Sequence, residues 1–298
     1  MSAFFYLFRN KWVPPADPHA SFEGKTVIVT GANTGLGLEA AIKFATSGAS
    51  RLIITSRDLK KGAAAKDIIR QRLAATSKTC LVEVWQLDLN DYSSIEAFGK
   101  RADAELETLD IAVLNAGVHN AKFEQSRYGW EGTMQVNTLS TTLLALTLLP
   151  KLKQSTKLTG KTATLEFVSS GLHYRTKLNE AQKSGDVDLL DSFNHSENFS
   201  AQKQYGASKL FLMYAVKELA AKAAHESGLE VFVTSVCPGM CQSDIARDYD
   251  SLLFRIGKSI LNVLFMRTAE QGSRTFVSGA LLGGEGHGQF WQHDVIKE

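Results

Sequence analysis

The sequence predicts an α/β protein, a single doubly wound domain with a mostly parallel sheet of about seven strands and helices on both faces. Short apolar runs rich in β-branched residues alternate with segments of helical spacing, which is typical of βαβ units. A glycine-rich turn joins the first of these strands to the first helix. The chain has 298 residues, of which 44% are hydrophobic, so it can bury a sizeable core in one domain.

Strand and helix patterns follow one another four times in the first half of the chain. Short apolar or alternating runs predict strands at 25–30, 51–55, 81–87 and 111–114. Helical spacing predicts helices at 36–47, 58–74, 93–106 and 129–152. Gly48 is a good residue to end the first helix, and Asp58 stands near the start of the second.

The second half continues the same alternation. The expected elements are strands at 164–168, 229–236 and 288–291 and helices at 201–225 and 268–282. Thr268 and Gln271 have the spacing of a capping box at the start of the last helix. We expect one domain over residues 22–298, preceded by an N-terminal arm, residues 1–21, whose segment Val13–Pro18 cannot be helical because of its three prolines.

Composition excludes several classes of protein. The net charge of +2 lacks the basic stripe of a nucleic-acid-binding protein, so no nucleic-acid partner is expected. Three cysteines without a CxxC pair fit a reducing compartment, and we expect a cytoplasmic protein. No stretch is apolar enough to span a bilayer. Attachment to a membrane surface, through the aromatic N-terminus or residues 251–266, stays open.

The glycine-rich turn predicts a phosphate-binding loop. It lies between a strand and a helix, so its glycines let the backbone approach a pyrophosphate while the helix N-terminus offers free N–H groups. The spacing is GxxxGxG, and a connection without a ligand is the alternative. The candidate contacts are Gly31, Asn33, Thr34, Gly35, Leu36 and Gly37.

The end of the second strand bears on the choice of coenzyme. An NAD site usually places an acidic residue there for the ribose 2′-hydroxyl. Ser56 stands at that position and Arg57 follows, and a guanidinium suits the 2′-phosphate of NADP. The sequence therefore favours NADP. Two alternatives remain, because Arg57 can be solvated surface and Asp58 can either cap the next helix or select NAD.

Two further strands end in polar or small residues. Asp88 and Leu89 follow the third strand, and Asn115, Ala116 and Gly117 follow the fourth. Ligands of open α/β sheets sit at the carboxyl ends of strands, so these residues are candidate cofactor contacts. Alone, Asp88 would be an ordinary turn residue.

A tyrosine and a lysine lie one helical turn apart. Tyr205 and Lys209 are at i and i+4, so their side chains share a helix face. At about 4 Å and an effective dielectric near 20, an ammonium attracts a phenolate by on the order of 4 kcal/mol. Since one pKa unit is about 1.4 kcal/mol, Lys209 can bring the tyrosine pKa two or three units closer to neutral, before desolvation is subtracted. An ordinary surface pair is the alternative.

Together these motifs resemble the short-chain dehydrogenase/reductase family, a Rossmann-fold family, over nearly the whole chain after the arm. The resemblance implies a catalytic tetrad of Asn137, Ser170, Tyr205 and Lys209. Tyr205 would be the general acid in reduction, Ser170 would hold the carbonyl oxygen, and Lys209 would bind the nicotinamide ribose. Asn137 would support a water-linked proton path to Lys209; its residue-level alternative is a satisfied core amide.

The resemblance also places Pro238 and Gly239 beside the nicotinamide, with Ser243 near the usual position of a threonine. Within the family, the glycine turn and Val168-Ser-Ser-x-x-His173 are similar to the branch of retinol dehydrogenases and the WW-domain oxidoreductase. The leader Ala16-Asp-Pro-His resembles fungal members of natural-product pathways, which implies secondary metabolism.

Two segments bear on the substrate. An insert at about 175–200 separates Ser170 from Tyr205, and we expect a loop or lid there. His173 and His195 can meet substrate or lie on the surface. A second segment, about 240–267, is rich in leucine, isoleucine and phenylalanine and is expected to cover an apolar pocket or pack on the core.

These expectations define a primary function and its alternatives. The primary one is an NADP-dependent carbonyl reductase or alcohol dehydrogenase, without a metal, that acts on a hydrophobic ketone, aldehyde or secondary alcohol. The alternatives keep the cofactor for non-redox chemistry (isomerisation, elimination or cyclisation) or for sensing. The expected partners are a hydrophobic small molecule and a second copy of the chain, because many family members pair through the helices that carry Asn137 and Tyr205.

Overall fold

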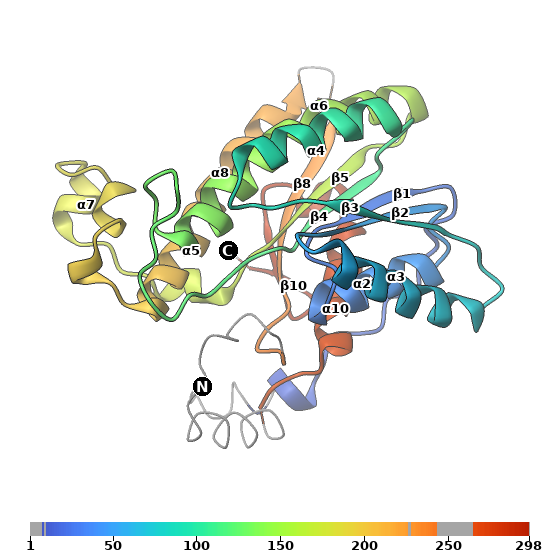
Figure 1. The fold of residues 1–298 in the computed structure, drawn as a ribbon, viewed down its shortest axis with the longest axis horizontal. Helices are drawn as coiled ribbons and strands as arrows, with labels where there is room; N and C mark the ends of the chain where they lie inside the picture. The colour runs from blue at the N-terminus through green and yellow to red at the C-terminus, as the bar shows by residue number, and fades with distance from the viewer. Residues whose placement is uncertain (1–7, 9, 226–227, 243–264, 298) are drawn as a thin grey trace.

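A central twisted sheet organises the molecule (Figure 1). The computed structural model describes residues 8, 10–225, 228–242 and 265–297. The main sheet has eight strands in the order β10-β9-β8-β5-β4-β1-β2-β3, and all neighbours are parallel except β9 and β10. Since β1 has β2 on one side and β4 on the other, the strand order reverses at β1, where open α/β sheets bind ligands.

The strands of this sheet match the apolar runs of the sequence closely. Their bounds are β1 Thr26–Val29, β2 Arg51–Ser56, β3 Leu81–Gln86, β4 Ile111–Leu114, β5 Ala163–Val168, β8 Val231–Cys237, β9 Phe290–Gln292 and β10 Val295–Lys297. Strands β1, β4 and β5 are buried along their whole length, as continuous apolar runs in a sheet covered on both faces should be.

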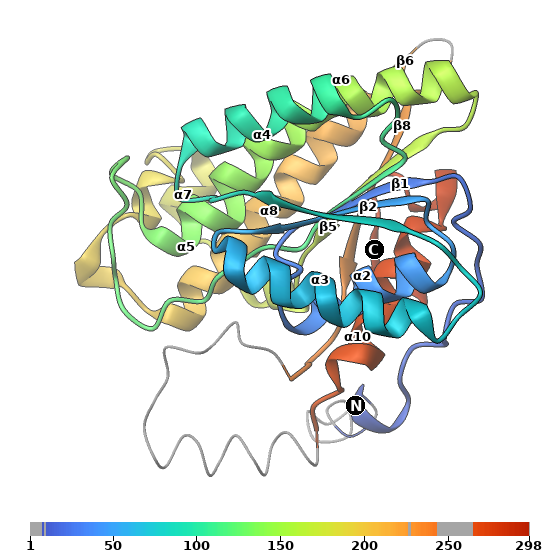
Figure 2. The same cartoon turned by 45° about the vertical axis from the view of Figure 1, so that its right-hand side comes forward.

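Helices cover both faces of the sheet, as predicted (Figures 1 and 2). On one face lie α4 Tyr92–Glu105, α6 Thr141–Thr159 and α8 Ala201–Ala223, and on the other α2 Gly35–Thr46, α3 Leu59–Ala74 and α10 Ala269–Ala280. Each face has its own core: Phe98 and Leu148 belong to the first, and Phe44 and Phe276 to the second. The predicted capping box of α10 is present, with Thr268 and Gln271 bonded reciprocally.

Several boundaries differ from the sequence prediction. The long helix predicted from residue 129 begins with α5 Gly132–Met134, continues as a π-helix η1 Gln135–Ser140 and becomes α6. The predicted strand 229–236 is split, because β7 Gly228–Leu229 pairs with β6 Ala224–His225 in a separate hairpin. Instead of about seven strands the main sheet has eight, because the chain turns back after β9 to add the antiparallel β10.

The insert and the described part of the arm lie outside the main sheet. In the insert, α7 Glu180–Ser184 follows η2 Gly171–Arg175, and two short 3₁₀ turns follow it, η3 Asp191–Phe193 and η4 Ser196–Asn198. In the arm, residues 10–12 are helical and residues 14–20 have no regular secondary structure. The last 3₁₀ turn is η6 Gly283–Gly286. In the part of the chain that the structure describes, no helix is both long and apolar enough to cross a membrane.

Candidate active site

The glycine turn has the geometry of a phosphate cradle. Gly31 and Gly35 have φ values of +62° and +56°, which side chains other than glycine rarely adopt. A Cβ on Gly37 would lie 2.5 Å from Asn115 Nδ2, so no larger residue fits there. No side chain caps the N-terminus of α2, which leaves its first N–H groups available to an anion. The loop therefore fits the pyrophosphate of a dinucleotide.

Asn115 and Ala116 brace this turn. Asn115 Nδ2 donates to Thr30 O at 2.9 Å, and Ala116 N donates to Thr30 Oγ1 at 3.0 Å. Gly31 N donates to Thr55 Oγ1 at 3.2 Å, which ties the turn to the second strand. The Asn-Ala-Gly motif, predicted as a cofactor contact, thus also holds the glycine turn in shape.

The three candidate residues at the end of β2, Ser56, Arg57 and Asp58, have different roles in the structure. Asp58 caps α3, because its carboxylate accepts from Lys60 N at 2.8 Å and Lys61 N at 3.2 Å. Ser56 is buried and donates to Asp58 O. Arg57 is exposed, and among the described residues its guanidinium makes no ion pair. The helix-capping alternative for Asp58 is therefore the one the geometry supports.

Asp88 closes a turn of its own. Its Oδ1 accepts from Asn90 N at 2.9 Å and from Asn90 Nδ2 at 3.1 Å, while Leu89 is buried. Gly117, at the end of β4, lies beside the tetrad: an added Cβ would be 3.0 Å from Asn137 Oδ1 and 3.8 Å from Lys209 Nζ. Strand ends from β3 and β4 thus meet the edge at which the glycine turn lies.

The structure brings Ser170, Tyr205 and Lys209 together. Ser170 follows β5, and its Oγ accepts from Leu172 N at 3.3 Å. Its side chain also interacts with the phenol of Tyr205, which lies in the second turn of α8, and lowers the pKa of that phenol. Lys209 Nζ lies 5.8 Å from the centre of the Tyr205 ring and donates to Val168 O at 2.8 Å. Ser169, the other serine of the pair, has a buried hydroxyl without a partner among the described residues.

Burial dominates the titration of the pair. It raises the pKa of the Tyr205 phenol above its usual 10, the nearby Cys237 adds to that rise, and the bond from Ser170 opposes it. Burial also lowers the pKa of Lys209 to about 8. The expected lowering of the tyrosine pKa by Lys209 is therefore not seen: burial is the largest influence on that pKa, and Lys209 is not among the others. The pair is arranged around a neutral phenol, the protonated form that a general acid needs.

Asn137 is a fully bonded amide inside the π-helix. Its Oδ1 accepts from Val118 N at 2.9 Å, and its Nδ2 donates to Val118 O at 2.9 Å and Ser208 Oγ at 3.1 Å. The satisfied-amide reading of Asn137 holds, and the amide also ties the loop after Gly117 to α8. A π-turn at such a residue is typical of functional sites.

The end of β8 completes the site. Pro238 is buried and Gly239 has a φ of +80°. The thiol of Cys237 accepts from Gly171 N at 3.4 Å and Gln292 Nε2 at 3.2 Å, and it lies close enough to Tyr205 and Lys209 to influence both pKa values. Ser243 and most of the predicted substrate-covering segment, residues 243–264, lie outside the described residues.

Sequence reasoning missed His119 and Cys237 as residues of this site and left the place of His173 open. The ring of His119 lies 4.8 Å from that of Tyr205, and burial lowers the His119 pKa, which favours its neutral form. His173, for which a surface position was one alternative, is buried and contacts Ser170 O at 2.7 Å. His195 is exposed beside Asp191. The i, i+3 spacing of Ser170 and His173 was the available signal for His173, whereas nothing local indicates His119 or Cys237.

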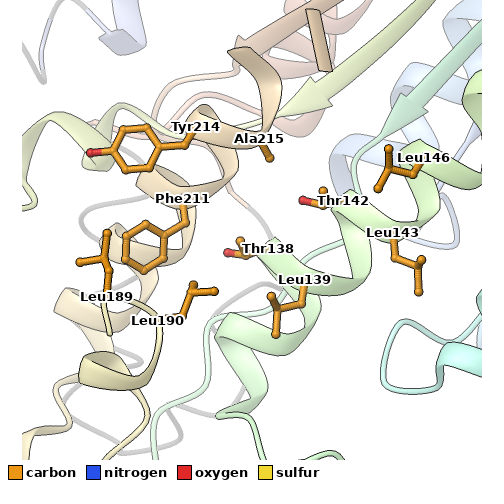
Figure 3. Close-up of a pocket in the computed structure, with 10 residues that line it drawn as sticks. All are labelled: Thr138, Leu139, Thr142, Leu143, Leu146, Leu189, Leu190, Phe211, Tyr214 and Ala215. Atoms are coloured by element: carbon orange, nitrogen blue, oxygen red, sulfur yellow. The ribbon is translucent and has the colours of Figure 1, made fainter. Parts of the chain in front are cut away.

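The insert packs on the helices that carry the tetrad. Its Phe193 contacts Phe211 on α8, and Asn194 donates to Gly129 O at 2.9 Å. Its Leu189 and Leu190 also line an apolar pocket of about 420 Å³ between η1–α6 and α8 (Figure 3). The remaining lining residues are Thr138, Leu139, Thr142, Leu143, Leu146, Phe211, Tyr214 and Ala215. That the insert acts as a lid remains a prediction.

Comparison with known proteins agrees with this geometry. A family model for short chain dehydrogenase matches residues 25–172. The short-chain dehydrogenase/reductase ffsI of Aspergillus flavipes is 40% identical over 99% of this chain and 84% of its own length. The short-chain dehydrogenase/reductase phmF of Phaeosphaeria nodorum is 42% identical over 95% and 81%.

A solved structure shares the fold at lower identity. A short chain dehydrogenase of Shigella flexneri, complexed with NADP, is 19% identical with a TM-score of 0.62, over 93% of this chain and 100% of that one. With the fungal relatives at 40% identity or more, the family assignment rests on sequence as well as on fold. The chain belongs to the short-chain dehydrogenase/reductase family of oxidoreductases.

Proposed function

We propose that this protein is an NADP(H)-dependent oxidoreductase that transfers a hydride between the nicotinamide and a hydrophobic ketone, aldehyde or secondary alcohol. The observation that carries the proposal is the grouping of three side chains: Ser170 interacts with the half-buried, neutral phenol of Tyr205, and Lys209 Nζ lies 5.8 Å from the centre of the Tyr205 ring. When bound, the nicotinamide ring supplies or accepts the hydride, and the chain's own groups handle the proton and the oxygen.

Tyr205 gives its proton to the substrate oxygen during reduction, and Ser170 donates a second hydrogen bond to the same oxygen. A substrate oxygen bound by both hydroxyls would be polarised and positioned at once. Lys209 places a positive charge under the phenol and stabilises the phenolate left behind. Asn137 ties the loop at Val118 to Ser208 of helix α8, the helix that carries Tyr205 and Lys209.

A hydrophobic substrate is supported by what surrounds the phenol. The ring of His119 covers that of Tyr205, and the neighbouring wall contains Tyr174 packed against Phe290. Aromatic and aliphatic surfaces with a few convergent polar groups are typical of small-molecule sites. The fungal relatives support a role in secondary metabolism, which the resemblance of the leader also suggested.

The Tyr205→Phe substitution tests the proposed acid. The purified protein is incubated with NADPH and a panel of hydrophobic ketones and aldehydes, and NADPH consumption is followed at 340 nm. We expect the variant to lose turnover by about 10²–10⁴-fold, which is the usual contribution of a general acid, while its Kd for NADPH stays within twofold of the wild type. Turnover that survives the substitution would remove Tyr205 from the proposed role.

The Arg57→Ala substitution tests the coenzyme. The exposed guanidinium has no ion-pair partner among the described residues and is available for a 2′-phosphate, whereas the neighbouring Asp58 carboxylate is engaged in capping α3. We expect the Kd for NADPH to rise about tenfold or more, as loss of a charged hydrogen bond predicts, with NADH affinity changed less than twofold. Arg70→Ala, on the exposed face of α3, is the matched control and should leave both constants unchanged. Equal losses for the two coenzymes would argue against NADP.

A further inference from the structure

The N-terminal arm reaches the end of β8. Asn10, in the arm, is 2% exposed, and its side chain bonds the backbone of the residue that follows Gly239. Asn10 Nδ2 donates to Met240 O at 3.1 Å and to Phe265 O at 3.1 Å, and Asn10 Oδ1 accepts from Met240 N at 3.3 Å. One side chain therefore joins two backbone positions that are 25 residues apart in the chain.

Arg267 also bonds to the arm, to the Pro238–Gly239 turn and to Met240. It is fully buried, and its guanidinium donates to Asn10 O at 2.6 Å, Val13 O at 3.1 Å and Pro238 O at 3.0 Å. Its backbone N–H donates to Met240 O at 2.9 Å. Because a buried guanidinium needs its donors bonded, the arm, the Pro238–Gly239 turn and Arg267 form one connected unit.

The fit at Gly239 is specific to this arrangement. A Cβ at that position would lie 2.3 Å from Asn10 Oδ1 and 2.9 Å from Arg267 Nη1, and the φ of +80° also requires glycine. The Asn10 side chain thus occupies the space that the missing Cβ leaves. Because Asn10 and Arg267 lie so close to Gly239, they restrict the position of the turn's backbone.

We propose that Asn10 is a positioning residue of the coenzyme site, and that the N-terminal arm, through Asn10 and Arg267, sets the position of the Pro238–Gly239–Met240 backbone against the nicotinamide end of the coenzyme. This inference rests on the proposed function, because it needs a nicotinamide coenzyme to bind at this turn. It assigns the arm a direct part in the site. The arm is also held at two other places, on helices α2 and α10. Asp17 pairs with Lys43 at 2.9 Å, and Arg274 donates to Pro15 O.

The test compares a whole coenzyme with a fragment. Kd values for NADPH and for adenosine 2′,5′-bisphosphate, which has no nicotinamide, are measured on the full-length protein. We expect Asn10→Ala to raise the Kd for NADPH about tenfold and to leave the Kd for the fragment within twofold, because only the nicotinamide end depends on the turn. In the coenzyme-free protein, hydrogen exchange at the Met240 amide should accelerate, since that N–H loses its acceptor.

Two companion variants keep the test decisive. Asn10→Asp places a buried carboxylate oxygen against the Met240 and Phe265 carbonyls, so we expect a loss of NADPH affinity at least as large as in Asn10→Ala. Asp17→Asn is the matched control within the arm and should change neither Kd. Equal weakening of NADPH and fragment, or unchanged NADPH binding in both Asn10 variants, would overturn the inference. A wild-type protein that binds neither NADPH nor NADH would instead contradict the proposed function.

Discussion

Ser169 and Ser170 are neighbours in the chain, yet their hydroxyls have opposite surroundings. Because side chains alternate along an extended segment, one hydroxyl is buried without a described partner and the other meets the Tyr205 phenol. The sequence alone could only favour the second serine by resemblance. The structure adds the physical reason, which is that Ser170 alone of the two shares a hydrogen bond with the proposed acid.

This difference predicts a clean contrast between two single substitutions. Ser170→Ala should lower kcat by about 10²–10³-fold, since removal of one donor to a developing oxyanion typically has that effect. Ser169→Ala should leave kcat within twofold, because its hydroxyl contacts nothing that the reaction uses. Steady-state rates with a saturating ketone, and melting temperatures for both variants, are the measurements. Similar losses for the two serines would show that the assignment of the donor is wrong.

Residues that touch the site from elsewhere in the chain were beyond sequence reasoning. His119 reaches Tyr205 across 86 positions, and Cys237, at the end of β8, comes near the site because β8 pairs with β5, the strand that leads to Ser170. Lys209 illustrates a second limit: its position one turn after Tyr205 was readable, but the balance between attraction and desolvation depends on burial that only the fold supplies.

The π-helix η1, which continues into α6, carries Asn137, and α8 carries Tyr205 and Lys209; η1, α6 and α8 also share an apolar face. Leu146 and Tyr214, which line the apolar pocket, are each 45% exposed. Exposed apolar side chains grouped in this way are typical of an interaction surface. Since the resemblance places a subunit interface on these helices, we expect a second copy of the chain to pack here.

Leu146→Glu tests that expectation. A charge buried at an interface opposes association, so we expect the variant to elute as a monomer where the wild type is a dimer or larger, in size-exclusion chromatography with light scattering. Leu158→Glu, near the end of the same helix and 63% exposed, is the matched control and should keep the wild-type mass. A monomeric wild type would remove the proposed interface.

Element types were readable from periodicity, whereas several boundaries were not. The alternation of short β-branched runs with helical spacing predicted every strand of the main sheet except β10, and the order of the six helices that cover the sheet. The π-turn at 135–140 has no signature in spacing, because it arises from one extra residue accommodated where Asn137 bonds to Val118 and Ser208. The β10 strand was missed because His293 and Asp294 adopt positive φ values, which few residues other than glycine do.

At the scale of the whole molecule, one buried carboxyl stands apart from the rest of the core. Glu166 lies in the central strand β5, fully buried, and neither of its carboxylate oxygens has a partner among the described residues. It faces α10, where a Cβ on Gly279 would be 2.5 Å from Glu166 Oε2. Burial raises the pKa of Glu166 well above its usual value, so the folded protein holds it protonated.

Stability should therefore depend on pH through this residue. A carboxyl with a raised folded pKa contributes stability that is complete below the unfolded pKa, about 4.3, and is lost as pH rises toward the folded pKa. We expect the free energy of unfolding of the wild type, relative to Glu166→Gln, to fall by about 1.4 kcal/mol per pH unit above pH 5. Denaturant unfolding of both proteins at several pH values measures this. A difference that is constant with pH would show that Glu166 does not titrate on unfolding.

The central claim is that hydride reaches a carbonyl carbon beside Tyr205 and that Tyr205 supplies the proton. Its most direct test uses NADPH with deuterium at the transferable ring position and a hydrophobic ketone that the protein reduces, with the alcohol analysed by mass spectrometry. The account predicts one carbon-bound deuterium per alcohol formed by the wild type, and about 10²–10⁴-fold slower formation of labelled alcohol by Tyr205→Phe, although the variant still binds NADPH. Alcohol without deuterium from the wild type, or labelled alcohol formed at the wild-type rate by the variant, would contradict it.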